Sequence, residues 1–173
     1  MAEITKVYRQ SMEATRFIGK KYSDSDRVDG MFGSLWGEWF SNNWFDEIEN
    51  QIDKTAKAVC DDGNAFIGLQ RWKDNEPYEY WIGIFTPKNT AVPEGYKFLD
   101  FPKSELGVCW VYGEEGSVFC HEQKCAGILA EKGLEIKNDE NDACWFFERY
   151  ACPRFTEKDE KGNIILDICY FIK

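Results

Sequence analysis

The sequence predicts a duplicated α+β fold, in which a strand–helix–strand–strand module occurs twice and forms an antiparallel sheet with two main helices. Three observations lead to this prediction. The order of expected elements is the same in residues 14–86 and 95–173. Leu-Gln-Arg-Trp at 69–72 lines up with Phe-Glu-Arg-Tyr at 147–150. No Ser/Gly linker divides the 173 residues, and two modules packed together have a sounder core than one module of about 80 residues. We therefore expect one domain over 1–173.

The first module begins with a β-type run at 14–19, which a polar loop at 20–33 follows. Ser34 is a candidate helix N-cap. Apolar residues then recur at every fourth position, which predicts one helix with a single apolar face. The residues of that expected face are Phe32, Trp36, Phe40, Trp44 and Ile48.

A polar break at 62–64 ends this helical stretch. Residues 66–72 and 78–85 are rich in aromatic and branched side chains, and a polar segment at 73–77 separates them. This pattern predicts a β-hairpin that completes the first module.

The second module repeats this order after Pro-Glu-Gly at 93–95. A glycine directly after a helical pattern is typical of a helix C-terminus, so Gly133 is expected to end the helix. The expected elements are strands at 96–99 and 106–112, a helix at 117–132 and strands at 144–150 and 164–172, with polar segments at 137–142 and 156–162.

The charge balance excludes some function classes. Acidic residues outnumber basic ones 31 to 21, which gives a net charge of −10. Nucleic-acid binding needs a positive field, so we expect no nucleic-acid partner. No apolar run approaches the roughly 20 residues of a membrane helix, and the N-terminus lacks the apolar stretch of a signal peptide. We expect no membrane association and a cytoplasmic location.

The seven cysteines are scattered and odd in number, which argues against a disulfide framework. A zinc site from Cys120, His121 and Cys125 is conceivable, but no second ligand pair follows at the usual spacing. We expect free thiols, no metal and no cofactor. The cysteines are Cys60, Cys109, Cys120, Cys125, Cys144, Cys152 and Cys169.

Glu148 is the most informative single residue. Side chains alternate faces along a strand, so Glu148 shares one face with Phe146 and Tyr150. A carboxylate among aromatic side chains is costly to bury unless a cation compensates it. That cation is either a ligand in a pocket or a side chain of the protein. The candidate side chains are Arg149, Arg71 and Lys173.

Several stretches resemble the GyrI-like small-molecule-binding family, which has the fold of the effector-binding domain of AraC-type and multidrug-responsive regulators. The order and spacing of these stretches carry the resemblance, which covers nearly the whole chain. They are Phe-Gly-Ser-Leu-Trp at 32–36, Tyr-Trp-Ile-Gly at 80–83, Val-Pro-Glu-Gly-Tyr at 92–96, Phe101-Pro102, Gly-Val-Cys-Trp-Val-Tyr at 107–112, Gly116, Trp-Phe-Phe-Glu-Arg-Tyr at 145–150 and the strand at 168–172.

This resemblance implies two modules related by a pseudo-twofold axis around a central aromatic cleft, with Glu148 facing a cationic or polarised ligand. Regulators of this kind carry a helix-turn-helix domain ahead of the effector domain, and this chain has no room for one. It therefore resembles a stand-alone member that senses or sequesters a lipophilic small molecule, in an oligomeric state that stays open. The expected ligand-binding residues are Glu148, Tyr150, Phe146, Tyr112, Trp110, Trp72, Gln70 and Trp39.

Two alternatives remain. Some proteins of the resembling family hydrolyse strained cyclopropane-containing compounds, and here Glu148 would serve with Tyr112 as hydrogen-bond donor and Glu38 as a second carboxylate. The other alternative is a protein-interaction module like the gyrase inhibitors, whose acidic charge attracts a basic partner. However, the charges at 157–161 alternate in sign, which favours a solvated connection.

Overall fold

Eight antiparallel strands form one sheet in the order β1-β6-β8-β7-β3-β4-β2-β5 in the computed structural model, which describes residues 1–56, 65–150 and 152–173. The predicted break at 62–64 and Cys60 lie outside the described residues. The strands are β1 (Glu3–Met12), β2 (Thr15–Tyr22), β3 (Phe66–Trp72), β4 (Glu79–Pro87), β5 (Lys97–Phe101), β6 (Ser104–Glu114), β7 (Cys144–Tyr150) and β8 (Asn163–Ile172).

The helices are α1 (Gly33–Ser41), α2 (Trp44–Glu49), α3 (Glu122–Glu131) and α4 (Pro153–Thr156), and single 3₁₀ turns span Asp24–Asp26 and Glu115–Ser117. No helix among the described residues is long and apolar enough to cross a membrane. These strands and helices confirm the predicted α+β class.

The strand order confirms the duplication. If β1 to β4 are matched with β5 to β8, the order of the sheet reads the same from either edge. The two halves meet where β3 pairs with β7. The first strand of each half pairs with a strand of the other half: β1 pairs with β6, and β5 pairs with β2.

The first half thus has one more strand than the sequence predicted, whereas all four strands of the second half were expected. The expected first module began at residue 14, whereas β1 at Glu3–Met12 precedes it. An edge strand has a neighbour on one side alone, and most of the β1 side chains are exposed or half-buried. Such a strand needs few apolar residues, so its sequence gives a weak β signal.

The predicted single helix of the first module is interrupted. Asn43 has a left-handed backbone with a φ of 53° and separates α1 from α2. Within α1, Phe40 of the predicted apolar face is 54% exposed, whereas Trp39, which lies off that face, is fully buried against Phe45. Phe32 rather than Ser34 occupies the N-cap position.

The helix of the second module starts later than predicted. A 3₁₀ turn at Glu115–Ser117 and a left-handed Cys120, with a φ of 62°, precede α3. Gly133, with a φ of 72°, follows the end of α3 as predicted, because glycine adopts this conformation without strain.

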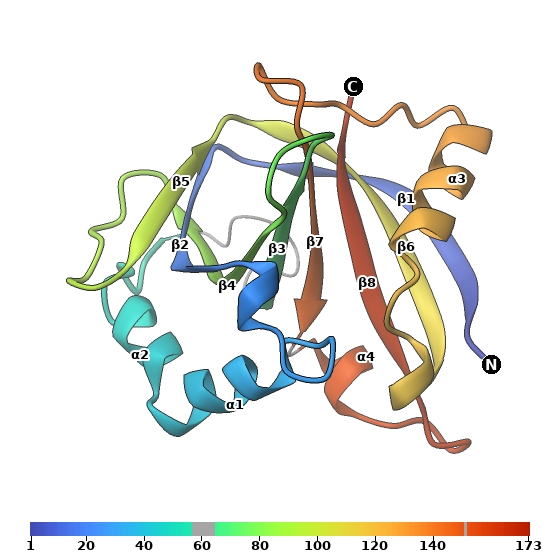
Figure 1. The fold of residues 1–173 in the computed structure, drawn as a ribbon, viewed down its shortest axis with the longest axis horizontal. Coiled ribbons are helices and arrows are strands. Elements are labelled where there is room, and N and C mark those ends of the chain that lie inside the picture. Colours follow the sequence, from blue (N-terminus) through green and yellow to red (C-terminus); the bar gives the residue numbers. More distant parts are fainter. Residues whose placement is uncertain (57–64, 151) are drawn as a thin grey trace.

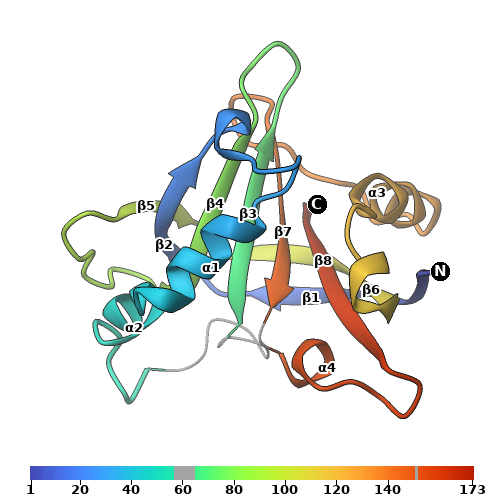
Figure 2. The same cartoon turned by 60° about the horizontal axis from the view of Figure 1, so that its bottom comes forward.

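The helices divide one face of the sheet into two flanks. α1 and α2 pack with β2, β3 and β4, whereas α3 packs with β6 and β8 (Figures 1 and 2). β3 and β7 lie between these flanks. On the opposite face the sheet packs against itself, and Phe101 of β5 stacks on Phe171 of β8 with ring centroids 5.1 Å apart. The centre of the helical face, over β3 and β7, therefore lies between the two helical flanks.

Candidate ligand-binding cavity

A cavity of about 1060 Å³ lies over the seam between β3 and β7. Alternate residues of the two strands face it and oppose each other across the seam. The opposing pairs, from one end to the other, are Phe66 with Tyr150, Gly68 with Glu148, Gln70 with Phe146, and Trp72 with Cys144. The walls come from both flanks and from α4, and they include Phe32, Trp36, Phe40, Tyr78, Tyr80, Phe119, Cys120, Glu122, Ala126, Phe155 and Tyr170.

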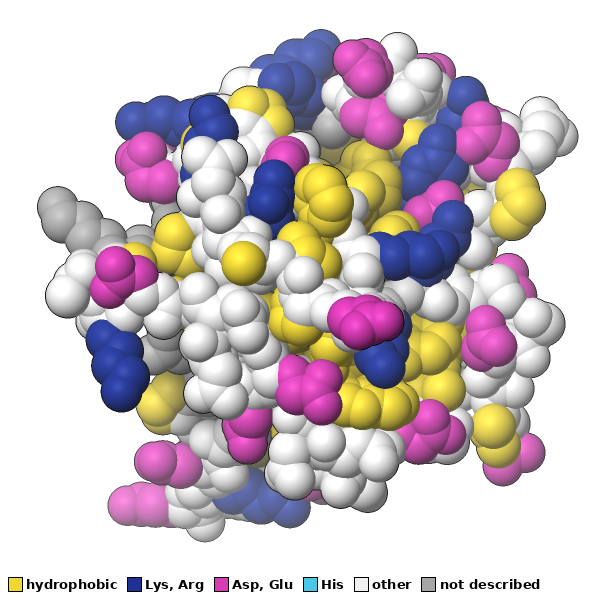
Figure 3. Space-filling view, turned by 90° about the vertical axis from the view of Figure 1, so that its left-hand side faces the viewer, with side chains coloured by type: hydrophobic (Ala, Val, Ile, Leu, Met, Phe, Trp, Pro, Cys, Tyr) yellow, Lys and Arg dark blue, Asp and Glu magenta, His cyan; other side chains and the backbone are white. Residues whose placement is uncertain are grey.

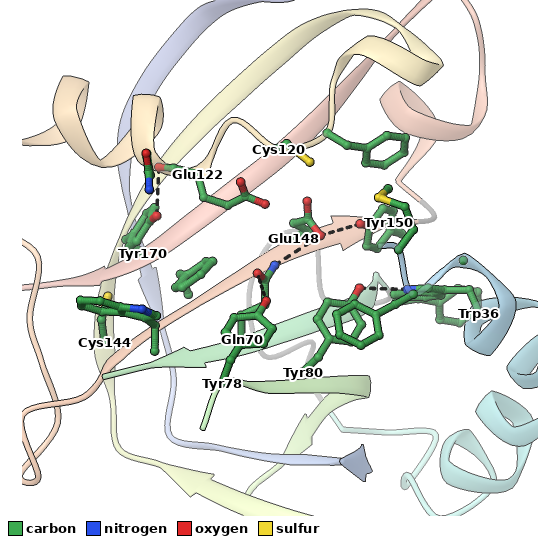
Figure 4. Close-up of a pocket in the computed structure, with 18 of the residues that line it drawn as sticks. Trp36, Gln70, Tyr78, Tyr80, Cys120, Glu122, Cys144, Glu148, Tyr150 and Tyr170 are labelled. Atoms are coloured by element: carbon green, nitrogen blue, oxygen red, sulfur yellow. Dashed lines mark hydrogen bonds between the residues drawn. The ribbon is translucent and has the colours of Figure 1, made fainter. Parts of the chain in front are cut away.

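Glu148 lies in the floor of this cavity with 5% of its surface exposed. The Tyr150 hydroxyl donates to Glu148 Oε2 at 2.6 Å, and Gln70 Nε2 donates to the same oxygen at 3.4 Å. The Tyr78 hydroxyl donates in turn to Gln70 Oε1 at 2.5 Å (Figure 4). These hydrogen bonds orient the Glu148 carboxylate through neutral donors and supply no positive charge.

The pKa of Glu148 is raised from 4.5 to about 8. Burial is the largest cause, and the nearby charge of Glu122 adds to it, whereas the Tyr150 hydrogen bond opposes both. Within residues 1–56, 65–150 and 152–173, no ion pair involves Glu148. At neutral pH Glu148 is therefore mostly protonated.

The side chains of the protein that could have paired with Glu148 are bound to other acids. Arg149 points to the opposite face, where its Nη2 lies 3.0 Å from Asp167 Oδ2. Arg71 Nη2 lies 2.7 Å from Glu76 Oε2, and Lys173 pairs with Glu135. The sheet-edge pairing considered for Glu148 is therefore wrong.

Aromatic side chains surround the Glu148 end of the cavity. Trp36 Nε1 donates to the Tyr80 hydroxyl at 3.0 Å, and the Trp36 ring meets the Tyr150 ring edge-on at 4.6 Å. Phe32 stacks on Tyr80 with ring centroids 4.0 Å apart, and Phe155 contacts Tyr150. Burial raises the pKa of both tyrosines well above the usual value, so their hydroxyls stay neutral donors.

Gly68 makes room for this arrangement. A Cβ atom at Gly68 would lie 2.7 Å from the Tyr80 hydroxyl and 3.3 Å from the Tyr150 ring. Any side chain at this position, opposite Glu148 in the sheet, would push both tyrosines away. The glycine therefore allows two tyrosines to approach the carboxylate.

The structure brings together five of the eight predicted binding residues. Glu148, Tyr150 and Phe146 line the cavity from β7, and Gln70 and Trp72 line it from β3. The predicted alternation of faces on β7 is confirmed, because Phe147 packs into the core on the opposite side.

The other three predicted residues lie outside the cavity lining. Trp110 and Tyr112 share a face of β6 as expected, but α3 covers the other face of that strand, through Cys109 and Val111. Tyr112 donates to Asp159 Oδ2 at 2.8 Å, so its expected role beside Glu148 is wrong. Trp39 of α1 is fully buried and donates to the Tyr22 hydroxyl at 2.9 Å.

Sequence reasoning also missed several lining residues. Tyr80 is paired with Gln70 across β3 and β4, and Tyr78 lies two residues before Tyr80, so all three face the same side of the sheet. This spacing could have placed both tyrosines on the cavity face. Glu38 is exposed and does not line the cavity, whereas Glu122 does. Nothing in the local pattern marks Glu122, because its position depends on how α3 packs against the sheet.

The cysteines at the considered metal site lie in different environments. Cys120 is exposed and lines the cavity, whereas Cys125 is a buried residue of α3, and the Cys109 thiol lies 3.9 Å from its carbonyl oxygen. Cys144 also lines the cavity, and burial raises its pKa to about 11. Cys109, Cys120, Cys125 and Cys144 are free thiols.

No family model and no curated protein matches the sequence. Solved structures do match its fold over nearly the whole chain. A structure of SAV2435 bound to tetraphenylphosphonium has a TM-score of 0.63 and 13% identity, with 98% of this chain and 94% of that chain covered. A candidate transcription regulation protein from Staphylococcus aureus MU50 has a TM-score of 0.60 and 13% identity, with 98% and 99% covered.

A third match is EcmrR in a complex with DNA, with a TM-score of 0.55 and 10% identity. It covers 97% of this chain but 57% of the EcmrR chain. At these identities the three matches establish the fold alone.

Proposed function

We propose that the protein binds lipophilic organic cations in the cavity over β3 and β7, with Glu148 as the counter-charge, and thereby senses or sequesters such compounds. The observation that carries this proposal is a carboxyl group that is 5% exposed, accepts hydrogen bonds from neutral donors and opens onto a cavity of about 1060 Å³.

Electrostatics favour a cation over a neutral or anionic ligand. An ionised carboxylate at this depth has lost most of its hydration, so a ligand cation that enters the cavity replaces the missing partner. The rings of Trp36, Tyr80 and Tyr150 add cation–π attraction, worth about 0.5–2 kcal/mol per contact. A neutral ligand of the same shape gains the apolar contacts alone.

The fold comparison supports the same ligand class. SAV2435, whose structure holds tetraphenylphosphonium, shares the fold over 98% of this chain. Tetraphenylphosphonium is therefore a suitable test ligand, and triphenylphosphine oxide is a neutral compound that keeps the phenyl rings.

The test is a tryptophan-fluorescence titration of the wild type, Glu148→Gln and Glu38→Gln with both compounds at pH 9, above the Glu148 pKa of about 8. Glu38 is exposed and off the cavity, so it serves as a matched control. We expect Glu148→Gln to weaken cation binding by about 1–3 kcal/mol, or roughly 5–150-fold, with little change for the oxide or for the control. Equal cation affinity in all three proteins would refute the proposal. Chromatography of the recovered cation separates binding from hydrolysis.

The net charge of −10 also leads us to propose that this chain does not bind DNA by itself. On the side of the molecule with α2 and β5, acidic and basic side chains are interspersed without a basic patch (Figure 3). Fluorescence anisotropy with duplex DNA at moderate salt should show no saturable binding.

A further inference from the structure

The cavity holds a second carboxylate that the proposed function does not use. Glu122, the first residue of α3, lines the cavity, and its side chain extends toward Glu148 (Figure 4). Among the described residues, neither Glu122 nor Glu148 forms an ion pair. Arg27 also lines the cavity, but its Nε lies 2.8 Å from Asp24 Oδ1, so its charge is already compensated.

The fold fixes the position of Glu122. The buried Tyr170 of β8 donates from its hydroxyl to the Glu122 backbone oxygen at 3.0 Å. Tyr170 is itself stacked on Phe146 of the cavity floor, with ring centroids 5.0 Å apart. The start of α3 is therefore tied to the same strands that carry Glu148.

The two carboxylates interact. The charge of Glu122 is the second-largest cause of the raised pKa of Glu148, and it also raises the pKa values of Tyr78 and Tyr150. A single positive charge at Glu148 would leave the Glu122 carboxylate without a counter-ion. A ligand with two positive charges would neutralise both acids and remove their mutual repulsion.

The cavity has room for such a ligand. Its floor spans six residue steps, from Phe66 to Trp72, which corresponds to roughly 20 Å of strand. Flat aromatic side chains line both ends, with Trp36 and Phe155 at one end and Trp72 at the other. An extended aromatic molecule therefore fits this floor better than a compact cation does.

We infer that the preferred ligand class of this cavity is the flat aromatic dication, with one charged group at Glu148 and the other at Glu122. This inference rests on the proposed function, because it takes the Glu148 cation site as given. Glu122 is then the residue that selects for the second charge.

The test compares methyl viologen with N-methyl-4-phenylpyridinium, two biaryl cations of nearly equal shape that carry two charges and one charge. Titrations at pH 9 keep the Glu148 carboxylate ionised, because its pKa is about 8. The proteins are the wild type, Glu122→Gln, Glu122→Asp and Glu148→Gln. Glu131→Gln is the control, because Glu131 lies at the exposed end of the same helix, off the cavity.

We expect the wild type and Glu131→Gln to bind methyl viologen about tenfold more tightly than the monocation. Glu122→Gln should abolish this preference while its monocation affinity changes less than about threefold, and Glu122→Asp should retain part of the preference. Glu148→Gln should weaken the binding of both compounds.

The inference fails if the preference for methyl viologen is absent in the wild type or persists in Glu122→Gln, while Glu148→Gln still weakens monocation binding. The proposed function would stand in that case. If Glu148→Gln changes the affinity for neither compound, nor for tetraphenylphosphonium, both the inference and the proposed function are wrong.

Discussion

Gln70 and Glu148 occupy equivalent positions in the two halves of the protein, and Gln70 Nε2 donates a 3.4 Å hydrogen bond to Glu148 Oε2. Each is the fifth residue of a seven-residue strand, and the two strands are paired at the centre of the sheet. One half thus carries an acid where the other half carries an amide. The duplication places the charged group and its neutral counterpart on opposite sides of the seam.

This equivalence predicts the outcome of a charge exchange. In the double variant Glu148→Gln/Gln70→Glu the net charge is unchanged, and Tyr78 can donate to the new carboxylate as it does to Gln70. We expect the exchange to recover at least a third of the tetraphenylphosphonium binding energy lost by Glu148→Gln alone, because the charge returns to the same cavity. Isothermal titration calorimetry measures both variants. No recovery in a folded double variant would show that the carboxylate must stand at position 148 to serve the cation.

The raised pKa of Glu148 predicts proton release on cation binding. Since the pKa is about 8 in the empty cavity, the group must lose its proton to pair with a cation below that pH. The affinity for tetraphenylphosphonium should therefore fall as the pH drops from 9 to 6, by up to about tenfold per unit below pH 8. Calorimetry in buffers of different ionisation enthalpy detects the released proton. A pH-independent affinity, or the same slope in Glu148→Gln, would contradict this assignment.

The same shift predicts that the site lowers the stability of the empty protein. In the unfolded chain Glu148 ionises near its usual value of 4.5, whereas in the fold it ionises near pH 8. Ionisation of the unfolded state therefore lowers the free energy of unfolding as the pH rises from about 4.5 to 8, and no further loss follows above pH 8.

Glu148→Gln lacks this loss. We expect the variant to gain roughly 1–4 kcal/mol over the wild type between pH 4.5 and 8, as measured by urea unfolding at both values. Glu38→Gln, at an exposed position, provides the control. An unchanged difference between pH 4.5 and 8 would mean that the carboxyl group is solvated in the folded state.

Gly68→Ala should damage the site and the fold together. The added methyl group would lie 2.7 Å from the Tyr80 hydroxyl, so this hydroxyl, which accepts a hydrogen bond from Trp36 Nε1, must shift. We expect a loss of about 1–3 kcal/mol in stability and a weaker affinity for tetraphenylphosphonium.

Gly37→Ala is the matched control for this change. Gly37 lies in α1, and an added Cβ would have no neighbour within 4 Å. Alanine there should stabilise the protein by about 0.5–1 kcal/mol through its helix propensity. Thermal denaturation of both variants checks the opposite signs, and a stabilised Gly68→Ala would show that the tyrosines can retreat without cost.

The sequence predicted what depends on local periodicity. Alternation along 144–150 placed Glu148 with Phe146 and Tyr150 and placed Phe147 on the core side, because successive residues of a strand face opposite sides wherever the strand lies. The hairpins were predicted correctly for the same reason, since their polar turns and β-type runs are local features. The repeat in the sequence aligned Gln70 with Glu148. The pairing of β3 with β7 brings the two side chains into contact.

The tertiary structure decided what depends on packing between distant segments. Trp110 and Tyr112 share a face, but α3 covers the opposite face of β6, so neither reaches the cavity. Trp39 is buried and Phe40 exposed because α1 turns its Trp39 side toward Phe45 and the sheet. Glu122 faces Glu148 because Tyr170, on another strand, holds the start of α3 over the sheet. Periodicity gives the face of an element, whereas the neighbour that covers that face depends on long-range contacts that no local pattern encodes.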